Sequence, residues 1–459
     1  MRSGLTNLLH LGRDAMSVNA KALDVTGQNV ANVNTPGYAR RRAELQARGY
    51  SQDSYGGVTV GSLSRAADEL TQRRLFDVQG QAAGARERSD SLAPVEAAFN
   101  DANGTGLAAG LSRFFDAFNT LASKPSDQTA RAGVLSAAQT VVDGFQMAST
   151  SIDGARADML AKAQGYTKQV NHLAQGIASL NGSVQSALAA GHDAADLLDR
   201  RDQLVRELSG LVDVKLGTNP DGTFLVRAGG QSLVEGNSAS TFSVTVDAQT
   251  NLVFESALGT APSVAFNGAA LGGKLGGLRE ARDIDLVATR ANLDTLAADL
   301  ATAVNGLHAA GTGLDGVGGR NLFAFNAASG ARSLAVDAAV LGQPSRVAAS
   351  STAAPGGNDV ALRLAALTDA KVTAGGTKSL VESYADLVGD LGLRRQKATS
   401  DEEVKRALAD QMSALHEETV GVSLDEEMVN LTRYQRSYEA SSKLLKTFDE
   451  LMQTLISLK

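Results

Sequence analysis

The 459-residue chain contains neither cysteine nor tryptophan, and aromatic residues make up only 4% of it. The lack of cysteine excludes disulfide bonds, thiolate metal sites and cysteine nucleophiles, and it leaves the redox compartment open. Lysine and arginine total 43 against 50 aspartate and glutamate residues, which gives a net charge of −7. An acidic chain lacks the positive surface that binds nucleic-acid phosphates, so we expect no nucleic-acid partner.

Long apolar runs are also missing. No stretch approaches the roughly 20 residues that cross a bilayer, so we expect no membrane insertion. The segment Met1–Asp14 mixes apolar with polar residues and has no small-residue cleavage site, so we expect any export to proceed without a cleaved signal peptide. The one short basic run, Arg40–Arg42, is expected to be a solvated strand edge or turn.

No catalytic or cofactor-binding motif occurs in the sequence context that its chemistry requires. Residues 268–275 fit the phosphate-loop spacing, but Leu275 replaces the hydroxyl that would hold magnesium. Residues 311–316 fit GxGxxG but follow a predicted helix instead of a strand. The five histidines are far apart, and Asp283 and Asp285 are expected on a helix surface of mixed charge. We therefore expect no enzyme activity, no catalytic residue, no cofactor and no metal.

The first 33 residues have helical periodicity. One row of the predicted helix is small or polar, and it consists of Leu5, Leu8, Gly12, Ala15, Asn19, Ala22, Thr26, Asn29 and Val33. Small residues allow a second helix to approach closely, and the asparagines can hydrogen-bond across the contact. Pro36 followed by Gly37 predicts a firm helix stop.

The chain also ends in helices, predicted over Leu380–Glu418 and Ser423–Ser457. The second contains a heptad seam with Leu424 one heptad before it, and the seam consists of Leu431, Tyr434, Tyr438, Ser441, Leu445, Phe448, Met452 and Leu455. Coiled-coil-like helices at both ends are most simply arranged as a pair from which the middle of the chain extends.

The middle is predicted to be mainly helical, with one β-rich insert. Residues 38–64 look irregular apart from a short strand pattern at 58–60. Short helices are predicted from 66 to 211, with breaks at Pro94, 104–106 and 124–125. Period-two patterns and turn residues indicate a small β domain at 213–275, and helix resumes from Arg279 to His308. The fold class is thus mainly α with a β-rich insert, as an elongated multi-domain protein.

Two terminal motifs resemble signatures of the axial proteins of the bacterial flagellum, the family of rod, hook and hook-associated proteins. Asn29–Tyr38 resembles the N-terminal signature, and residues 423–441 with 448–450 resemble the C-terminal one. In the middle, residues 196–204 and 272–283 are similar to hook-associated proteins of the junction between hook and filament. Two motifs at opposite ends make a chance match improbable.

The resemblance implies a structural subunit of the flagellum that connects hook to filament and is required for filament assembly. It implies three parts: a terminal inner-tube domain of residues 1–36 and 420–459, an elongated helical bundle of 37–212 and 276–419, and an outer β-rich insert at 213–275. It also implies an extracellular location at the hook–filament junction. The implied partners are copies of the chain in a helical ring, hook protein, hook-associated protein 3, an export chaperone that binds the C-terminal helix, and the flagellar export apparatus.

The assembly interface is expected on both terminal segments. Its predicted residues are Leu5, Leu8, Ala15, Ala22, Asn29, Asn32, Asn34, Pro36 and Gly37, with Leu424, Met428, Leu431, Tyr434, Tyr438, Leu445, Phe448, Met452 and Leu455. Other assignments stay open at this stage: hook protein, distal rod protein or hook-associated protein 3, and a secreted enzyme with axial-type termini. An adhesin role would depend only on the β-rich insert.

Overall fold

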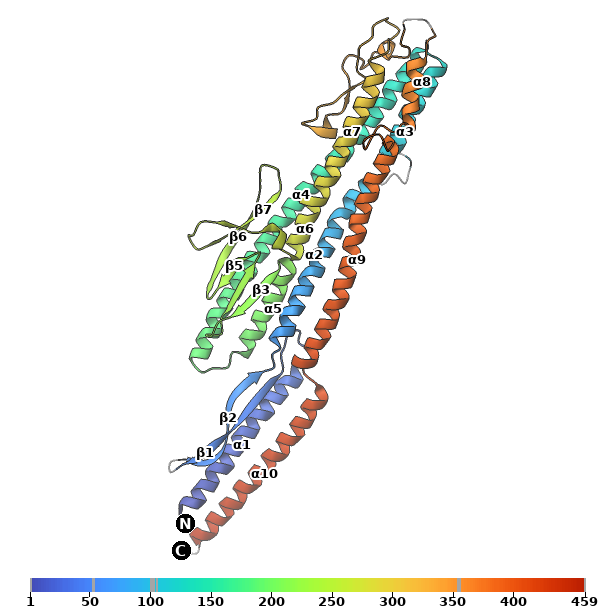
Figure 1. Ribbon diagram of the computed structural model, residues 1–459. Helices are drawn as coiled ribbons and strands as arrows, with labels where there is room; N and C mark the ends of the chain where they lie inside the picture. Colours follow the sequence, from blue (N-terminus) through green and yellow to red (C-terminus); the bar gives the residue numbers. More distant parts are fainter. Residues whose placement is uncertain (1, 52–53, 100–103, 105, 353–355, 458–459) are drawn as a thin grey trace.

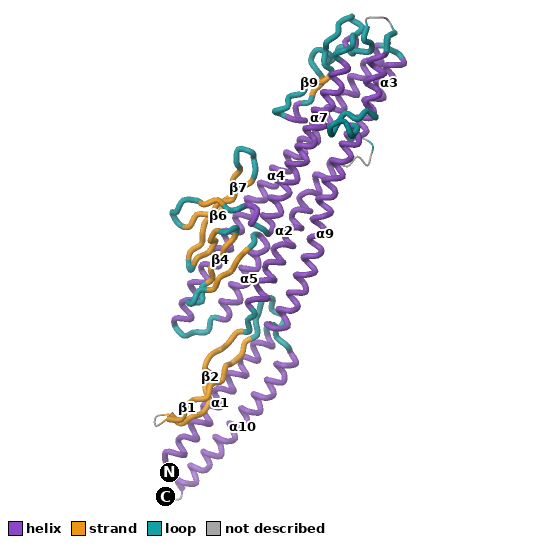
Figure 2. The backbone as a smooth tube through the Cα atoms, viewed as in Figure 1, coloured by secondary structure: helices purple, strands orange, loops and turns teal. Residues whose placement is uncertain are grey.

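The computed structural model describes residues 2–51, 54–99, 104, 106–352 and 356–457. The chain forms an elongated, mainly helical rod whose two ends lie side by side at one tip (Figure 1). The strands of the described residues form a sheet on one flank, a hairpin near the termini and a short pair near the far tip (Figure 2). The predicted fold class, mainly α with a β-rich insert, is confirmed.

The terminal end of the rod consists of two helices and a hairpin. These elements are α1 (Arg2–Ala31), α10 (Leu424–Ser457), β1 (Arg41–Ser51) and β2 (Ser54–Arg65). The predicted helices and the stop before Pro36 are confirmed. The short strand predicted at 58–60 lies within β2, but the prediction that the rest of residues 38–64 is irregular is wrong. The antiparallel hairpin packs against α1, and its strands were hard to recognise because they are rich in glycine, alanine and arginine.

Long helices run along the body of the rod. They are α2 (Glu69–Phe99), α3 (Leu107–Ser123), α4 (Gln128–Ala189), α5 (Ala195–Leu211), α6 (Gly273–Arg279), α7 (Leu286–His308), α8 (Asp359–Ala365) and α9 (Leu380–Val420). The predicted break at 124–125 is confirmed, and the one at 104–106 lies between α2 and α3, partly outside the described residues. The predicted break at Pro94 is wrong, because burial of Leu92 and Val95 beside it holds α2 continuous.

Glycines allow two helices of the body to touch backbone to backbone. A Cβ atom on Gly277 of α6 would lie 1.9 Å from the carbonyl oxygen of Gly84 in α2. The glycine-rich segment 272–277 is therefore required for packing, which explains its phosphate-loop spacing without any ligand. The segment 311–316 follows α7 as a loop, as expected.

The β-rich insert is a six-stranded antiparallel sheet whose strands follow chain order. They are β3 (Val214–Thr218), β4 (Phe224–Ala228), β5 (Gln231–Glu235), β6 (Ser238–Val246), β7 (Leu252–Leu258) and β8 (Val264–Ala265). Its small core contains Phe242 stacked on Phe254. Asn171 of α4 bonds both backbone groups of Phe242, at 2.8 and 2.7 Å, and so anchors the sheet to the rod.

The far tip of the rod contains a cluster of phenylalanines, among them Phe114, Phe118 and Phe323. The strand pair β9 (Phe323–Ala324) and β10 (Ala335–Val336) lies here. Short 3₁₀ turns occupy Gly268–Ala270, Gly330–Ser333, Pro344–Arg346 and Ala366–Thr368.

A π-helical turn, Glu280–Asp285, joins α6 to α7 and corrects one expectation. Asp285 is fully buried and pairs with Arg88 of α2 at 2.7 Å and with Arg394 of α9 at 3.1 Å. The prediction that Asp283 and Asp285 lie on a helix surface is therefore wrong. The spacing of residues within one helix could not reveal that arginines of two other helices, Arg88 and Arg394, would pair with Asp285.

Candidate functional site

The pair of terminal helices is built on the small residues of α1. A Cβ atom on Gly12 would lie 2.9 Å from Cγ of Leu445 in α10, so the glycine is what lets α10 approach. Ala22 is buried and Ala15 is half-buried in the same row of α1. The predicted close approach thus occurs at Gly12, on the predicted small-residue row.

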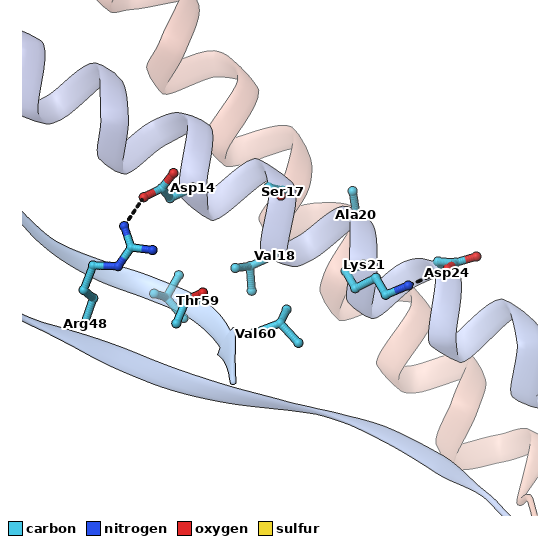
Figure 3. Close-up of a pocket in the computed structure, with 10 residues that line it drawn as sticks. Asp14, Ser17, Val18, Ala20, Lys21, Asp24, Arg48, Thr59 and Val60 are labelled. Carbon is cyan, nitrogen blue, oxygen red and sulfur yellow. Dashed lines mark hydrogen bonds and ion pairs between the residues drawn. The ribbon is translucent and has the colours of Figure 1, made fainter. Parts of the chain in front are cut away.

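A shallow groove of about 580 Å³ separates α1 from the hairpin (Figure 3). Val18 and Val60 contribute to its apolar part, and Asp14 forms an ion pair with Arg48 across the groove at 3.2 Å. Lys21 pairs with Asp24 of the same helix at 3.4 Å. These charges are paired with one another, so the groove is a packing feature between α1 and the hairpin.

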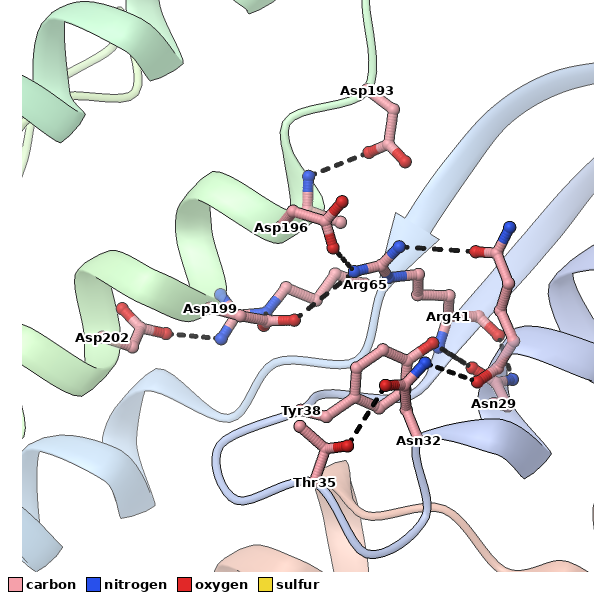
Figure 4. A network of polar contacts seen from close by, with 12 residues as sticks. Asn29, Asn32, Thr35, Tyr38, Arg41, Arg65, Asp193, Asp196, Asp199 and Asp202 are labelled. Atoms are coloured by element: carbon pink, nitrogen blue, oxygen red, sulfur yellow. Dashed lines mark hydrogen bonds and ion pairs between the residues drawn. The ribbon is translucent and has the colours of Figure 1, made fainter.

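Asn29 is the centre of a polar network at the inner end of α1 (Figure 4). Its amide nitrogen donates to the carbonyl of Arg41 at 2.9 Å and to the carboxylate of Glu427 at 3.2 Å. Its amide oxygen accepts from the backbone N–H of Arg41 and from the hydroxyl of Tyr38, both at 3.0 Å. Because Asn29 is 1% exposed, these four bonds satisfy a side chain that water cannot reach.

The rest of the N-terminal signature forms the turn that leaves α1. Asn32 donates to the carbonyl of Gln28 at 2.9 Å and accepts from the Thr35 hydroxyl at 3.1 Å. Gly37 has φ of +80°, a conformation that L side chains adopt with strain. Asn34, Pro36 and Gly37 are exposed, so this turn is available to neighbouring molecules.

Arg40 ties the start of the hairpin to α10. Its guanidinium pairs with Glu427 at 2.6 Å and with Glu426 at 2.5 Å. Burial is the largest single influence and lowers the pKa of Arg40, but the hydrogen bonds and charges of Glu426 and Glu427 together outweigh it, so the pKa of Arg40 is raised. The Arg40 backbone N–H also donates to the carbonyl of Val420 at the end of α9, at 2.9 Å.

Arg41 and Arg65 tie the hairpin to α5 of the body. Arg41 pairs with Asp196 and, at 3.6 Å, with Asp199. Arg65 pairs with Asp199 at 2.7 Å and with Asp202. The three carboxylates are spaced three residues apart, which places them along one face of α5. We call the contacts of Asn29, Arg40, Arg41 and Arg65 the polar joint.

The polar joint corrects the expectation for the basic run. Arg40 and Arg41 are buried and ion-paired, and Arg42 is exposed. Their carboxylate partners come from α5 and α10, which are distant in the sequence. The three-residue spacing of Asp196, Asp199 and Asp202 indicates an acidic face on one helix, which could have suggested basic partners. In the sequence analysis, that segment contributed only to the resemblance.

Burial at the joint shifts several pKa values. Burial raises the pKa of the Asp199 carboxyl, although Arg65 and Arg41 act in the opposite direction. Burial likewise raises the pKa of Tyr38, and it lowers the pKa of His416, with Arg206 adding to that effect. A cleft of about 240 Å³ is lined by Tyr38 and Asp199 on one side and by His416, near the end of α9, on the other. These pKa shifts arise because the polar joint buries charged and titratable side chains where the hairpin meets the body of the rod.

On α10, the predicted interface residues divide into two sets. Leu431, Tyr434, Leu445 and Phe448 are half-buried. Exposed members are Leu424, Met428, Tyr438 and Met452, joined by Val429, Leu444, Leu451 and Ile456. The side chains of Leu5, Leu8 and Leu455 lie outside the described residues. Packing on α1 therefore uses only part of the apolar surface of α10.

The exposed set identifies what the terminal pair can do. At 100° per residue, Leu424 and Met428 lie beside the row that contacts α1, so α10 presents an uncovered apolar flank. Within the described residues no group of histidine and carboxylate side chains could hold a metal ion, and none of their helices is long and apolar enough to span a bilayer. The chemistry of this site is that of helix association.

Comparison with known proteins agrees with this architecture. Residues 92–323, about half of the chain, match the family described as the flagellar hook-associated protein FlgK helical domain. Residues 9–38 match the flagella basal body rod protein family, and residues 414–458 match the flagellar basal body rod FlgEFG protein C-terminal family. These last two matches contain the two terminal motifs on which the resemblance was based.

Individual relatives match over the full length. Flagellar hook-associated protein 1 of Bacillus subtilis is 28% identical over 98% of this chain and 97% of that protein. The proteins of the same name from Salmonella typhimurium and Escherichia coli are 25% and 24% identical, each over 99% of this chain and 100% of the relative.

A solved structure shares the fold. It is described as the flagellar hook junction protein FlgK from Burkholderia pseudomallei, and it superimposes with a TM-score of 0.68 at 17% identity, covering 75% of this chain and 99% of that one. The family model covers half of this chain and the two rod-protein families cover its ends, so the chain belongs to the FlgK family of flagellar hook-associated proteins.

Proposed function

We propose that the chain is a structural subunit of the bacterial flagellum that joins the hook to the filament and that filament assembly requires. The observation that carries the proposal is the terminal pair, in which α10 leaves an apolar flank exposed after packing on α1. Such a surface requires a partner in the assembled state. The names of the relatives and of the matched structure support a position next to the hook.

The expected division into parts becomes part of this proposal. Residues 1–36 with 420–459 form the inner tube, 37–212 with 276–419 form the surrounding bundle, and 213–275 face outward. Two features support it: the termini lie together at one tip, and the sheet lies on one flank of the rod (Figure 1). The hairpin β1–β2, which sequence analysis assigned to the bundle, lies against α1 and accompanies the terminal helices.

Further partners follow from an axial position. Copies of the chain form a helical ring that contacts hook protein on one side and hook-associated protein 3 on the other. The subunit reaches the cell exterior through the flagellar export apparatus. A chain without cysteine crosses a narrow channel unfolded with no cross-link to hinder it.

Immunogold labelling of detached flagella tests the proposed position. We expect label confined to the boundary between hook and filament. Label along the whole hook would identify a hook protein, label on the rod a rod protein, and an absence of label from every part of the flagellum would refute the proposal.

We propose that an export chaperone covers the heptad seam of α10 before export. Changing Leu431 and Leu445 to Asp places two charges on that seam. Arg433 and Glu439 are exposed on other faces of α10, so their change to Ala provides the matched control. We expect the double Asp variant to lose chaperone binding in pull-down assays and to release filament subunits into the medium. Equal binding by both variants, or equal loss, would place the chaperone elsewhere.

A further inference from the structure

The terminal end of the rod, made of α1, α10 and the hairpin, is attached to the body by polar contacts. The chain passes between the two parts at residues 66–68 and 421–423. Within the described residues, the contiguous hydrophobic core runs from Phe76 to Leu391 and contains no residue of α1, α10 or the hairpin. The polar joint and the backbone bond from Arg40 to Val420 therefore hold the two parts together. Contacts between charged groups respond to pH, whereas apolar packing does not depend directly on it.

The imidazole of His416, on α9, is buried at this attachment. His416 is 9% exposed, and its Nδ1 atom has no hydrogen-bond partner among the described residues. It lines the cleft of about 240 Å³ together with Tyr38, from the turn after α1, and Arg65, from the hairpin. Because a water molecule occupies about 30 Å³, the cleft has room for several, and a proton can reach the ring while the joint is closed. His416 is thus a titratable group between the two parts of the rod.

Charged side chains from several elements surround the ring. They come from the end of β2, the segment before α2, α5 and α9 itself. Within the described residues the titratable and charged groups that face His416 are Arg65, Asp68, Asp199, Asp202, Arg206, Glu207, Glu417 and the phenol of Tyr38. Arg65 is already paired with Asp199 and Asp202 (Figure 4). A proton on His416 therefore adds a third positive charge beside Arg65 and Arg206, while two of the nearby carboxylates are engaged.

The closed joint disfavours the protonated ring. Burial is the main cause and lowers the pKa of His416, and the charge of Arg206 adds to it, while Asp68 and Asp202 act in the opposite direction without offsetting it. Once the joint opens, water hydrates the ring, and its pKa returns to about 6.5. Neutral His416 thus stabilises the closed joint above about pH 6.5, and this stabilisation is lost as pH falls through the lower pKa of the closed form.

Two other groups of the cleft titrate differently. Burial raises the pKa of Asp199, so protonation of Asp199 as pH falls removes a cost of keeping the joint closed. Burial also raises the pKa of Tyr38 above its ordinary value of 10, outside the range in which His416 titrates. The effect of Asp199 is opposite in sign to that of His416, and replacing His416 alone separates the two.

We propose that His416 is a proton-operated release for the joint, whose ring, once protonated beside Arg65 and Arg206, favours separation of the hairpin from α5 and from the end of α9. Separation leaves the two parts connected only by residues 66–68 and 421–423, so the terminal end can then turn relative to the body. The body stays folded, because its hydrophobic core lies outside the joint. The release is a property of the single chain and does not depend on the proposed function.

Hydrogen exchange in the full chain tests the inference. The backbone N–H of Arg40 reports on the joint, because its hydrogen bond ends on Val420 at the end of α9. One titrating group changes the opening equilibrium by at most about tenfold per pH unit, so from pH 7.5 to 5.5 we expect exchange at Arg40, corrected for intrinsic rate, to rise at least about threefold. His416→Gln, which keeps a polar side chain without a titrating ring, should abolish that rise.

The matched control is His172→Gln, since His172 is exposed on α4 and its loss should leave the parental rise unchanged. Peptides from α4 should keep their protection at both pH values in every variant. A flat profile in the parent, an undiminished rise in His416→Gln, or an equal rise in the α4 peptides would overturn the inference, because acid would then act elsewhere or unfold the body.

A second pair of variants tests the site without changing His416. Arg206→Gln removes a positive charge that faces the ring, so we expect the pH midpoint of the rise at Arg40 to move upward. Arg200→Gln removes the same charge from an exposed position on α5 and should leave the midpoint at the parental value. Equal midpoints for the two variants would overturn the inference, because the proton would then be taken up away from Arg206.

Discussion

Replacing Asn29 by alanine should open the polar joint while the body of the rod stays folded. The amide of Asn29 makes four hydrogen bonds, two of them to the backbone of Arg41 and the others to Tyr38 and Glu427. Alanine removes all four and leaves both backbone groups of Arg41 buried without this partner. Water cannot enter readily, because Asn29 is 1% exposed.

The size of the effect follows from those bonds. Each buried hydrogen bond contributes about 1 kcal/mol net, so losing four weakens the joint by about 3 to 4 kcal/mol. Since about 1.4 kcal/mol corresponds to a tenfold change, local opening should become roughly 100 to 1,000 times more frequent. The Asn29→Asp variant keeps the shape but places a carboxylate against Glu427, so at neutral pH we expect at least as large an effect.

Hydrogen exchange followed by mass spectrometry measures this opening in peptides that contain Arg41. The control is Asn34→Ala, because the side chain of Asn34 is exposed and its loss should change exchange by less than about threefold. Peptides from α4 report on the body and should exchange as in the parent. If Asn29→Ala exchanges like Asn34→Ala, the bonds of Asn29 do not hold the joint together.

Two further predictions concern the terminal pair and the far tip. Gly12→Val places a side chain against Leu445, so tryptic cleavage within α10 should accelerate at least tenfold. The control is Gly27→Ala, whose Cβ meets nothing within 4 Å, and this variant should be cleaved at the parental rate. Equal cleavage rates for the two variants would contradict the close contact. At the far tip, the ring of His308 accepts a hydrogen bond from the Ala348 N–H at 3.0 Å, and burial lowers the pKa of His308. Neutral His308 therefore stabilises the fold above about pH 6.5, and this stabilisation is lost as pH falls through the lower pKa of the folded state. Exchange at Ala348, corrected for intrinsic rate, should rise as pH falls from 7.5 to 5, and a flat profile would refute this.

Periodic elements were predictable from the sequence because periodicity depends only on neighbouring residues. The last two helices, predicted over Leu380–Glu418 and Ser423–Ser457, are observed over Leu380–Val420 and Leu424–Ser457. The sheet was recognisable from its alternation and turns. The hairpin was not, because its contact with α1 uses residues such as Gly57, whose Cβ would lie 3.1 Å from Leu11, and glycine adds nothing to a hydrophobic pattern.

The polar joint could not be predicted because its members are separated along the chain. Glu427 lies 398 residues after Asn29, and Asp196 lies 155 residues after Arg41. A basic run is solvated in most proteins, and only the fold brings carboxylates to this one. The N-terminal motif identified the family, but the reason for its asparagine, a fully bonded buried amide, is visible only in three dimensions.

The joint also explains how a weakly specified helix pair keeps its register. The α1–α10 contact places Leu445 against Gly12 and leaves an apolar flank uncovered. Sliding α10 by one turn, about 5.4 Å, would move Leu445 away from Gly12. The same slide would separate Glu427, which is 2% exposed, from both Arg40 and Asn29. A buried carboxylate without partners costs about 3 to 5 kcal/mol, which is enough to select one register. Polar groups at the inner end of the pair therefore reinforce the register that the contact of Gly12 with Leu445 sets, and the apolar flank remains available for contacts between subunits.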